Sequence, residues 1–75
     1  MQNNSTWYKQ ASRKLKSELQ AHGINYNDLK DGLNAIIGIN ESYAAIASKI
    51  NRGSFSLAFY LQCLKVIDSI KSTNT

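Results

Sequence analysis

The sequence predicts an all-α domain, a compact bundle of four to five short helices. Three observations lead to this fold class. The chain has 75 residues, so it forms one domain over residues 1–75 and has no room for a second core. It contains no proline and only four glycines, whereas a β-sandwich usually needs more turn residues. Apolar residues recur at helical spacing in four segments, and glycines separate these segments.

Residues 6–22 form the first predicted helix. Ser5 or Thr6 can cap its start, because a side-chain oxygen there accepts from a free backbone N–H. One face of this helix is apolar, and a second face carries long polar and basic side chains. The apolar face holds Tyr8, Ala11, Leu15 and Leu19, and the second face holds Lys9, Arg13, Lys16 and Gln20. Gly23 then suits the left-handed position that ends a helix.

The next two predicted helices cover residues 25–37 and 42–52. Asn25 caps the first of them, and Asp28 adds negative charge near its N-terminal dipole. Ser42 or Asn40 caps the second. Gly38 and Gly53 follow the two helices and suit their C-terminal ends. In residues 25–37, helical spacing predicts inward positions for Leu29, Leu33 and Ile36 or Ile37. In residues 42–52, it predicts inward positions for Tyr43, Ile46, Ala47 and Ile50.

Ser54 or Ser56 caps the fourth predicted helix, which continues to about Lys71. It is apolar around most of its circumference, so it must be covered on more than one side. Either it is the central helix of the bundle, or its outer face is the interface of a homodimer. The dimer residues would then be Phe59, Cys63, Val66 and Ile70. The chain ends, residues 1–5 and 72–75, are expected to be flexible.

The net charge of +4 comes from nine basic and five acidic residues. Positive charge is concentrated in residues 1–23 and 42–75, whereas residues 24–41 are net negative. This balance favours an anionic partner such as nucleic acid. No apolar run approaches the roughly 18 residues of a membrane span, and the N-terminus lacks an apolar signal segment. We therefore expect a cytoplasmic protein with no membrane partner.

The sequence does not favour catalysis or metal binding. One cysteine and one histidine are too few for a structural zinc site, and one cysteine cannot form an internal disulfide. No phosphate-binding loop or nucleophile motif is present in the sequence. His22 suits the C-terminal dipole of the first helix, and Cys63 lies in the most apolar segment, as a buried thiol does. We expect no enzyme activity, no metal, no cofactor and no small-molecule substrate.

The arrangement of two short helices inside a small bundle is typical of helix-turn-helix DNA readers. Residues 25–37 would be the positioning helix, and residues 42–52 would be the helix that enters the major groove. Small, hydroxyl and basic side chains on the outer face of this helix suit contacts with base edges. The predicted base-contacting residues are Ser42, Ala45, Ser48, Lys49 and Arg52. The predicted phosphate-contacting residues are Tyr26, Asn27, Arg13 and Lys14.

Two segments carry a resemblance to a known family: LKSELQAHGINYNDL at 15–29 and SKINRGSFSLAFYLQCLKVI at 48–67. They resemble small bacterial domains related to the lambda-repressor-like helix-turn-helix fold, many of which are classed as domains of unknown function. The second segment is the more specific, because KINRG at 49–53 is followed by a Phe-Ser turn and AFYLQCL. The resemblance implies a lambda-repressor-like fold first and binding to double-stranded DNA second.

The chain departs from the family pattern at three places. Lys30 stands where a small residue is usual, and Tyr26 stands where the family has a glutamine that contacts phosphate. The connection over residues 33–42 is longer than the usual turn. These differences affect the angle between the two helices of the motif.

Two hypotheses follow from the sequence. The first is a small DNA-binding protein that regulates transcription and dimerises through its fourth helix. The second is a protein-protein interaction module on the same fold that does not bind DNA, because a fold alone does not establish a function.

Overall fold

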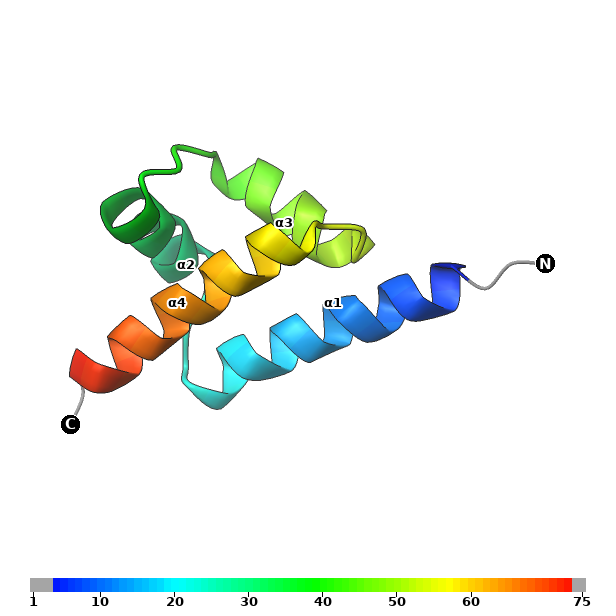
Figure 1. Cartoon of the computed structure of the whole chain (residues 1–75), viewed down its shortest axis with the longest axis horizontal. Helices are drawn as coiled ribbons and strands as arrows, with labels where there is room; N and C mark the ends of the chain where they lie inside the picture. The colour runs from blue at the N-terminus through cyan, green and yellow to red at the C-terminus, as the bar shows by residue number, and fades with distance from the viewer. Residues whose placement is uncertain (1–3, 74–75) are drawn as a thin grey trace.

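The computed structural model describes residues 4–73, and every regular element in that range is helical. The four α-helices are α1 (Asn4–Ala21), α2 (Tyr26–Gly32), α3 (Tyr43–Arg52) and α4 (Leu57–Thr73). A π-helical turn, η1 (Leu33–Ile37), continues directly from α2. The predicted all-α fold class is therefore confirmed. Figure 1 shows α1 and α4 running in the same direction, with α2, η1 and α3 packed on one side of them.

Helix α1 begins at Asn4 and therefore earlier than expected, so Ser5 and Thr6 lie inside its first turn instead of capping it. Its other end follows the prediction. Gly23 has a φ of 65°, and the Ile24 N–H donates back to the Leu19 carbonyl at 2.9 Å. This bond satisfies a carbonyl that the helix leaves free, and it turns the buried Ile24 side chain back onto the core.

The start of α2 is held by a reciprocal pair of side-chain caps. The Asn25 Oδ1 accepts from the Asp28 N–H at 2.8 Å, and the Asp28 Oδ2 accepts from the Asn25 N–H at 3.3 Å. Two backbone donors at the helix start are thus satisfied. The predicted cap at Asn25 is confirmed.

The helix predicted over residues 25–37 is α-helical only as far as Gly32, and its last turn is π-helical. The N–H groups of Gly38 and Ile39 both donate to the Leu33 carbonyl, at 2.8 and 3.1 Å. Gly38 then takes a φ of 89°, which stops the helix. The wider turn precedes the connection that leads to α3.

Helix α3 is capped by the Ser42 Oγ, which accepts from the Ala45 N–H at 3.1 Å, and it ends at Gly53 with a φ of 74°. A Cβ at position 53 would collide with the backbone carbonyl of Tyr8, so glycine also lets this end of α3 rest on α1. The Ser56 Oγ caps α4 by accepting from the Phe59 N–H at 3.0 Å.

The structure tests the prediction of flexible chain ends only in part. Residues 4–5 belong to α1, and residues 72–73 belong to α4. Residues 1–3 and 74–75 lie outside the described range.

The core draws apolar side chains from all four α-helices and the π-helical turn. Its buried members are Leu15, Leu19, Ile24, Leu29, Leu33, Ile46, Ile50, Phe59, Cys63, Val66 and Ile67. Ile70 is partly buried and packs against them. Helix α4 packs against α1, α2 and η1, so its apolar side chains are covered from more than one side.

This position corrects the predicted dimer surface. Phe59, Cys63 and Val66 are 5%, 0% and 0% exposed within the single chain, so they are not available to a second copy. The outer face of α4 carries Leu57 and Leu61 instead, which are 71% and 54% exposed. The sequence correctly predicted a helix that needs cover on several sides, but not which side chains remain uncovered.

Cys63 is buried, as the sequence predicted. None of the helices described over residues 4–73 is sufficiently long and apolar to span a membrane.

Candidate nucleic-acid interface

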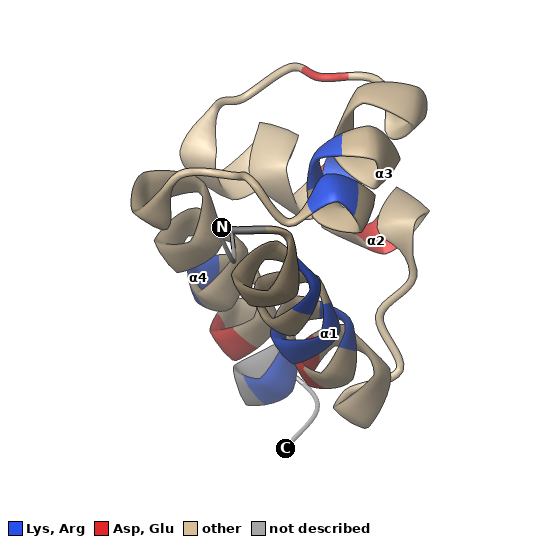
Figure 2. Ribbon diagram, turned by 90° about the vertical axis from the view of Figure 1, so that its right-hand side faces the viewer, with Lys and Arg blue, Asp and Glu red and all other residues tan. Residues whose placement is uncertain are grey.

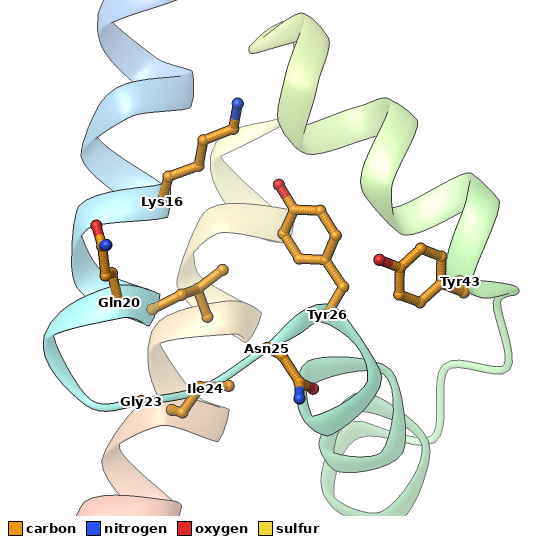
Figure 3. A pocket seen from close by; sticks show the side chains of 8 residues that line it. Lys16, Gln20, Gly23, Ile24, Asn25, Tyr26 and Tyr43 are labelled. Carbon is orange, nitrogen blue, oxygen red and sulfur yellow. The ribbon is translucent and has the colours of Figure 1, made fainter.

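A groove of about 460 Å³ opens between α1 and the starts of α2 and α3 (Figure 3). Lys16 and Gln20 line it from α1, Tyr26 lines it from α2, and Tyr43 lines it from α3. The Tyr26 ring stands between α1 and α3, and its hydroxyl points along the groove on the side where the Lys16 amine extends. We refer to this feature as the tyrosine groove. It brings together residues of α1, α2, α3 and the turn between α1 and α2.

The two tyrosines support each other. Their ring centroids lie 5.8 Å apart at an interplanar angle of 62°, which is the edge-to-face geometry that aromatic pairs prefer. Burial raises the pKa of Tyr26 above its ordinary value of 10.0, and the neighbouring Tyr43 adds to the rise. The Tyr26 hydroxyl therefore stays protonated at neutral pH. It offers a hydrogen-bond donor beside the Lys16 side chain.

Tyr43 is the residue of this groove that the sequence assigned wrongly. Its spacing predicted an inward position, but the side chain is 48% exposed. Tyr43 is the first residue of α3, and at the end of a helix the apolar stripe can extend past the core. The signal that could have identified it is the second tyrosine, Tyr26, at the first position of α2.

The cations of α1 fall on two different sides of the helix. Lys9, Arg13 and Lys16 recur at intervals of four and three residues and so share one side, which is the side of the tyrosine groove. We call these three residues the basic stripe. All three are exposed, and none has an ion-pair partner within the described part of the chain. Figure 2 shows the basic segments along α1, with α3 and α4 on different sides of this helix.

Lys14 does not belong to this stripe. Its Nζ lies 3.3 Å from Glu18 Oε2, and its side chain borders a second groove together with Leu57 and Tyr60 of α4. Arg13 and Lys14, which were predicted to contact phosphates together, therefore lie on different sides of α1. Two consecutive residues of a helix are 100° apart, so one of them leaves the face that the other occupies.

Lys49 is held inside the domain. Its Nζ lies 2.6 Å from Glu41 Oε2 and 4.9 Å from the centroid of the Phe59 ring. The side chains of Lys49 and Glu41 are only 34% and 28% exposed. A base contact by Lys49 would break an ion pair and a cation–π contact, so its main role is to fix the connection before α3 onto the start of α4.

The outer face of α3 keeps part of the predicted reading surface. Ser42, Ser48 and Arg52 are exposed as expected, whereas Ala45 is half-buried. The Arg52 Nη1 donates to the Ser48 Oγ at 2.9 Å, which orders both side chains. Sequence reasoning missed further exposed residues on this helix, namely Ala44 and Asn51. Asn27, predicted to contact phosphate, is exposed in the first turn of α2.

Arg52 also borders a small recess at the start of α4. This recess, of about 210 Å³, is lined by Lys49, Arg52, Ser54, Phe55, Ser56 and Phe59. It presents the Arg52 guanidinium, which has no ion pair among the described residues, and the hydroxyl side chains of Ser54 and Ser56. Such a set of donors suits an oxyanion such as a phosphate.

Comparison with known proteins gives one positive result. The family model described as Domain of unknown function (DUF6471) matches residues 7–71, and the chain belongs to this family. The expected membership of a family of unassigned function is therefore confirmed. No curated protein and no solved structure matches the chain.

Proposed function

We propose that this member of the DUF6471 family is a small DNA-binding protein and a transcriptional regulator. In this proposal the fold is a helix-turn-helix of the lambda-repressor-like type, with α3 in the major groove and the start of α2 near the phosphate backbone. The observation that carries the proposal is the position of the basic stripe. Its Lys16 lines the tyrosine groove, where α2 and α3 both begin, and Arg13 and Lys9 follow on the same side of α1.

Phosphate contacts would supply most of the binding energy. The three cations of the basic stripe have no acidic partner within the described residues, so DNA binding would not first break an ion pair. Arg52, at the other edge of α3, adds a fourth charge. Four phosphate contacts predict that log Kd changes with log salt with a slope of about 3.6.

Base contacts would come from the outer face of α3. Ser42 and Ser48 remain from the predicted set, and their hydroxyl groups can bond to several bases, whereas Arg52 is counted among the phosphate contacts. Asn51 adds an amide that suits adenine, and Ala44 allows close approach or contact with a thymine methyl group. Lys49 is reassigned from base contact to support of the domain, because of its contacts with Glu41 and Phe59.

The direct test is fluorescence anisotropy with labelled duplex DNA across a salt series. The duplexes are random sequences and the sequence upstream of the protein's own gene. The proposal expects binding that weakens steeply with salt and is tighter for the upstream duplex. Absence of binding even at low salt would overturn it.

A matched pair of variants locates the interface. Lys16→Ala removes a cation of the basic stripe, and Lys14→Ala removes an equal charge from the opposite side of the same helix. We expect Lys16→Ala to lower the salt slope by about 0.9, and Lys14→Ala to change it little. Equal effects of the two variants would mean that net charge, and not this face, determines binding.

A second function is favoured by a different observation. Leu57 and Leu61 project from α4 with more than half of each side chain exposed. An interaction module that does not bind DNA would use such a surface. The anisotropy experiment separates the two functions, because the module predicts no binding to any duplex.

A further inference from the structure

An exposed apolar surface runs along α1 and α4, on the side away from the tyrosine groove. Leu57 and Leu61 lie one turn apart on α4 and are 71% and 54% exposed. Trp7 of α1 is 68% exposed, and it shares a helical side with Ala11. Single exposed apolar residues are common on proteins. Here Leu57 lines a groove between α4 and α1, and Leu61 and Trp7 each lie one turn from a lining residue, which is typical of interaction sites.

The groove gives this surface both a recess and projections. The groove measures about 410 Å³. Its walls are formed by Ala11 and Lys14 of α1, by Leu57 and Tyr60 of α4, and by Phe55 in the turn before α4. Leu61 projects one turn further along α4, and Trp7 projects one turn before Ala11. With a two-fold axis placed between the recess and Leu61, the Leu61 side chain of each copy would face the recess of the other. Self-complementarity of this kind is what a symmetric interface requires.

The charges around the groove favour a second copy over a charged partner. The chain carries a net charge of +4, so two copies repel each other wherever their basic sides meet. Along the α1–α4 surface the charge is balanced, because Lys14 pairs with Glu18 at 3.3 Å. On α4, the exposed Lys65 and Asp68 lie on the turns after Leu61 and also carry opposite charges. An anionic partner would be drawn to the basic stripe, whereas this surface attracts neither sign.

We propose that the α1–α4 surface is the interface of a two-fold symmetric homodimer, formed by Trp7, Ala11, Leu57, Tyr60 and Leu61. The interface leaves the tyrosine groove and the outer face of α3 uncovered in both copies. It replaces the predicted interface of Phe59, Cys63, Val66 and Ile70, whose side chains belong to the core and its border. The inference does not rest on DNA binding, because self-association is measured without DNA.

Sedimentation velocity from about 1 to about 500 µM tests the dimer. The expected result is a shift from the 8.4 kDa monomer to a species of twice that mass as the concentration rises. Trp7 is the only tryptophan, so its fluorescence should shift to shorter wavelength over the same range as water leaves its ring. A chain that stays monomeric throughout would overturn the proposal and leave the groove to a segment of another protein.

A matched pair of variants tests the location of the interface. Leu61→Glu places a charge in the proposed interface, whereas Ile36→Glu places the same charge at a similarly exposed apolar residue of η1. Both positions face solvent in the monomer, so both variants should keep the helical circular dichroism of the wild type. We expect Leu61→Glu to weaken the dimer at least about tenfold, and Ile36→Glu to leave it unchanged. A dimer that tolerates Leu61→Glu would overturn the assignment of this surface.

Discussion

At the scale of single residues, Lys49 determines how the outer face of α3 should be interpreted. A lysine near the end of a predicted recognition helix suggests a DNA contact. The structure gives it two partners, Glu41 at 2.6 Å and the Phe59 ring at 4.9 Å. Both partners are distant in sequence or in another helix, so no local pattern could have revealed them.

The resulting prediction concerns stability. Lys49→Met keeps the apolar stem but leaves the half-buried Glu41 carboxylate without its cation, and it should lower the free energy of unfolding by about 1–2 kcal/mol. Arg52→Met removes only an exposed hydrogen bond to Ser48 and should cost less than about 0.5 kcal/mol. Urea unfolding followed by circular dichroism measures both. Equal losses would show that the Glu41 ion pair does not stabilise the domain.

Cys63 provides a prediction for the dependence of stability on pH. Burial raises the pKa of this thiol from 9.0 to about 12, although the nearby Lys49 charge lowers it somewhat. In the unfolded chain the thiol ionises above about pH 9, whereas in the folded chain it stays protonated. Its contribution to stability is therefore complete below pH 9 and is lost as the pH rises towards 12.

The loss attributable to Cys63 should reach about 1 kcal/mol at about pH 10. Urea unfolding of the wild type and of Cys63→Ala at about pH 7 and about pH 10 isolates it. The variant is less stable at both values, because it leaves a small cavity, but its stability should fall less between them. If the two proteins lost equal stability over this interval, the thiol would not be the titrating group.

At the scale of elements, the sequence predicted the number, order and approximate extent of the helices. The signals were local ones: glycines at Gly23, Gly38 and Gly53, and capping side chains at Asn25 and Ser42. The structure uses each of them as a start or an end, because these residues satisfy or bend the backbone independently of tertiary contacts.

The π-helical turn could not be predicted in this way. The apolar spacing of residues 25–37 fits an α-helix throughout, and it contains no signal for the π-helical segment from Leu33, which packs against α4. The contact at Gly32, directly before the turn, is especially close. A Cβ at this position would collide with the Cγ1 of Val66, which is fully buried. Glycine at position 32 therefore allows α2 to approach α4.

This contact predicts an opposition between helix propensity and packing. Gly32→Ala should gain about 1 kcal/mol of helix propensity but lose more to the collision, so that the domain becomes about 1 kcal/mol less stable. Val66→Ala alone should cost about 2 kcal/mol because it leaves a cavity. The variant with both substitutions should be at least about 1 kcal/mol more stable than the summed losses of the two single variants predict. The reason is that the new methyl group at position 32 enters the space that the valine side chain left. Additive effects in urea unfolding would mean that Gly32 and Val66 do not limit the approach of the helices.

At the scale of the whole molecule, the two sides of α1 have different chemistry. One side carries the basic stripe next to the tyrosine groove, and the other carries Trp7 and Ala11 next to α4. The sequence separated the basic and apolar faces of this helix, since spacing alone determines them. It could not assign Lys14 to the α4 side, because that depends on which neighbour packs against each face. The proposed DNA interface and the proposed homodimer interface are therefore on opposite sides of α1.

This separation predicts that salt acts in opposite directions on the two proposed associations. A fourfold rise in salt should weaken DNA binding about a hundredfold, since about four phosphate contacts each release counterions. The same rise should leave the dimer unchanged or strengthen it, because the α1–α4 surface is apolar and its charges are balanced, while the repulsion between two copies of charge +4 is screened. Anisotropy with a duplex and sedimentation without one, at matched salt concentrations, give the two constants. A dimer that dissociates with salt in parallel with DNA release would mean that charged contacts hold the copies together, and the interface would then have to include the basic stripe.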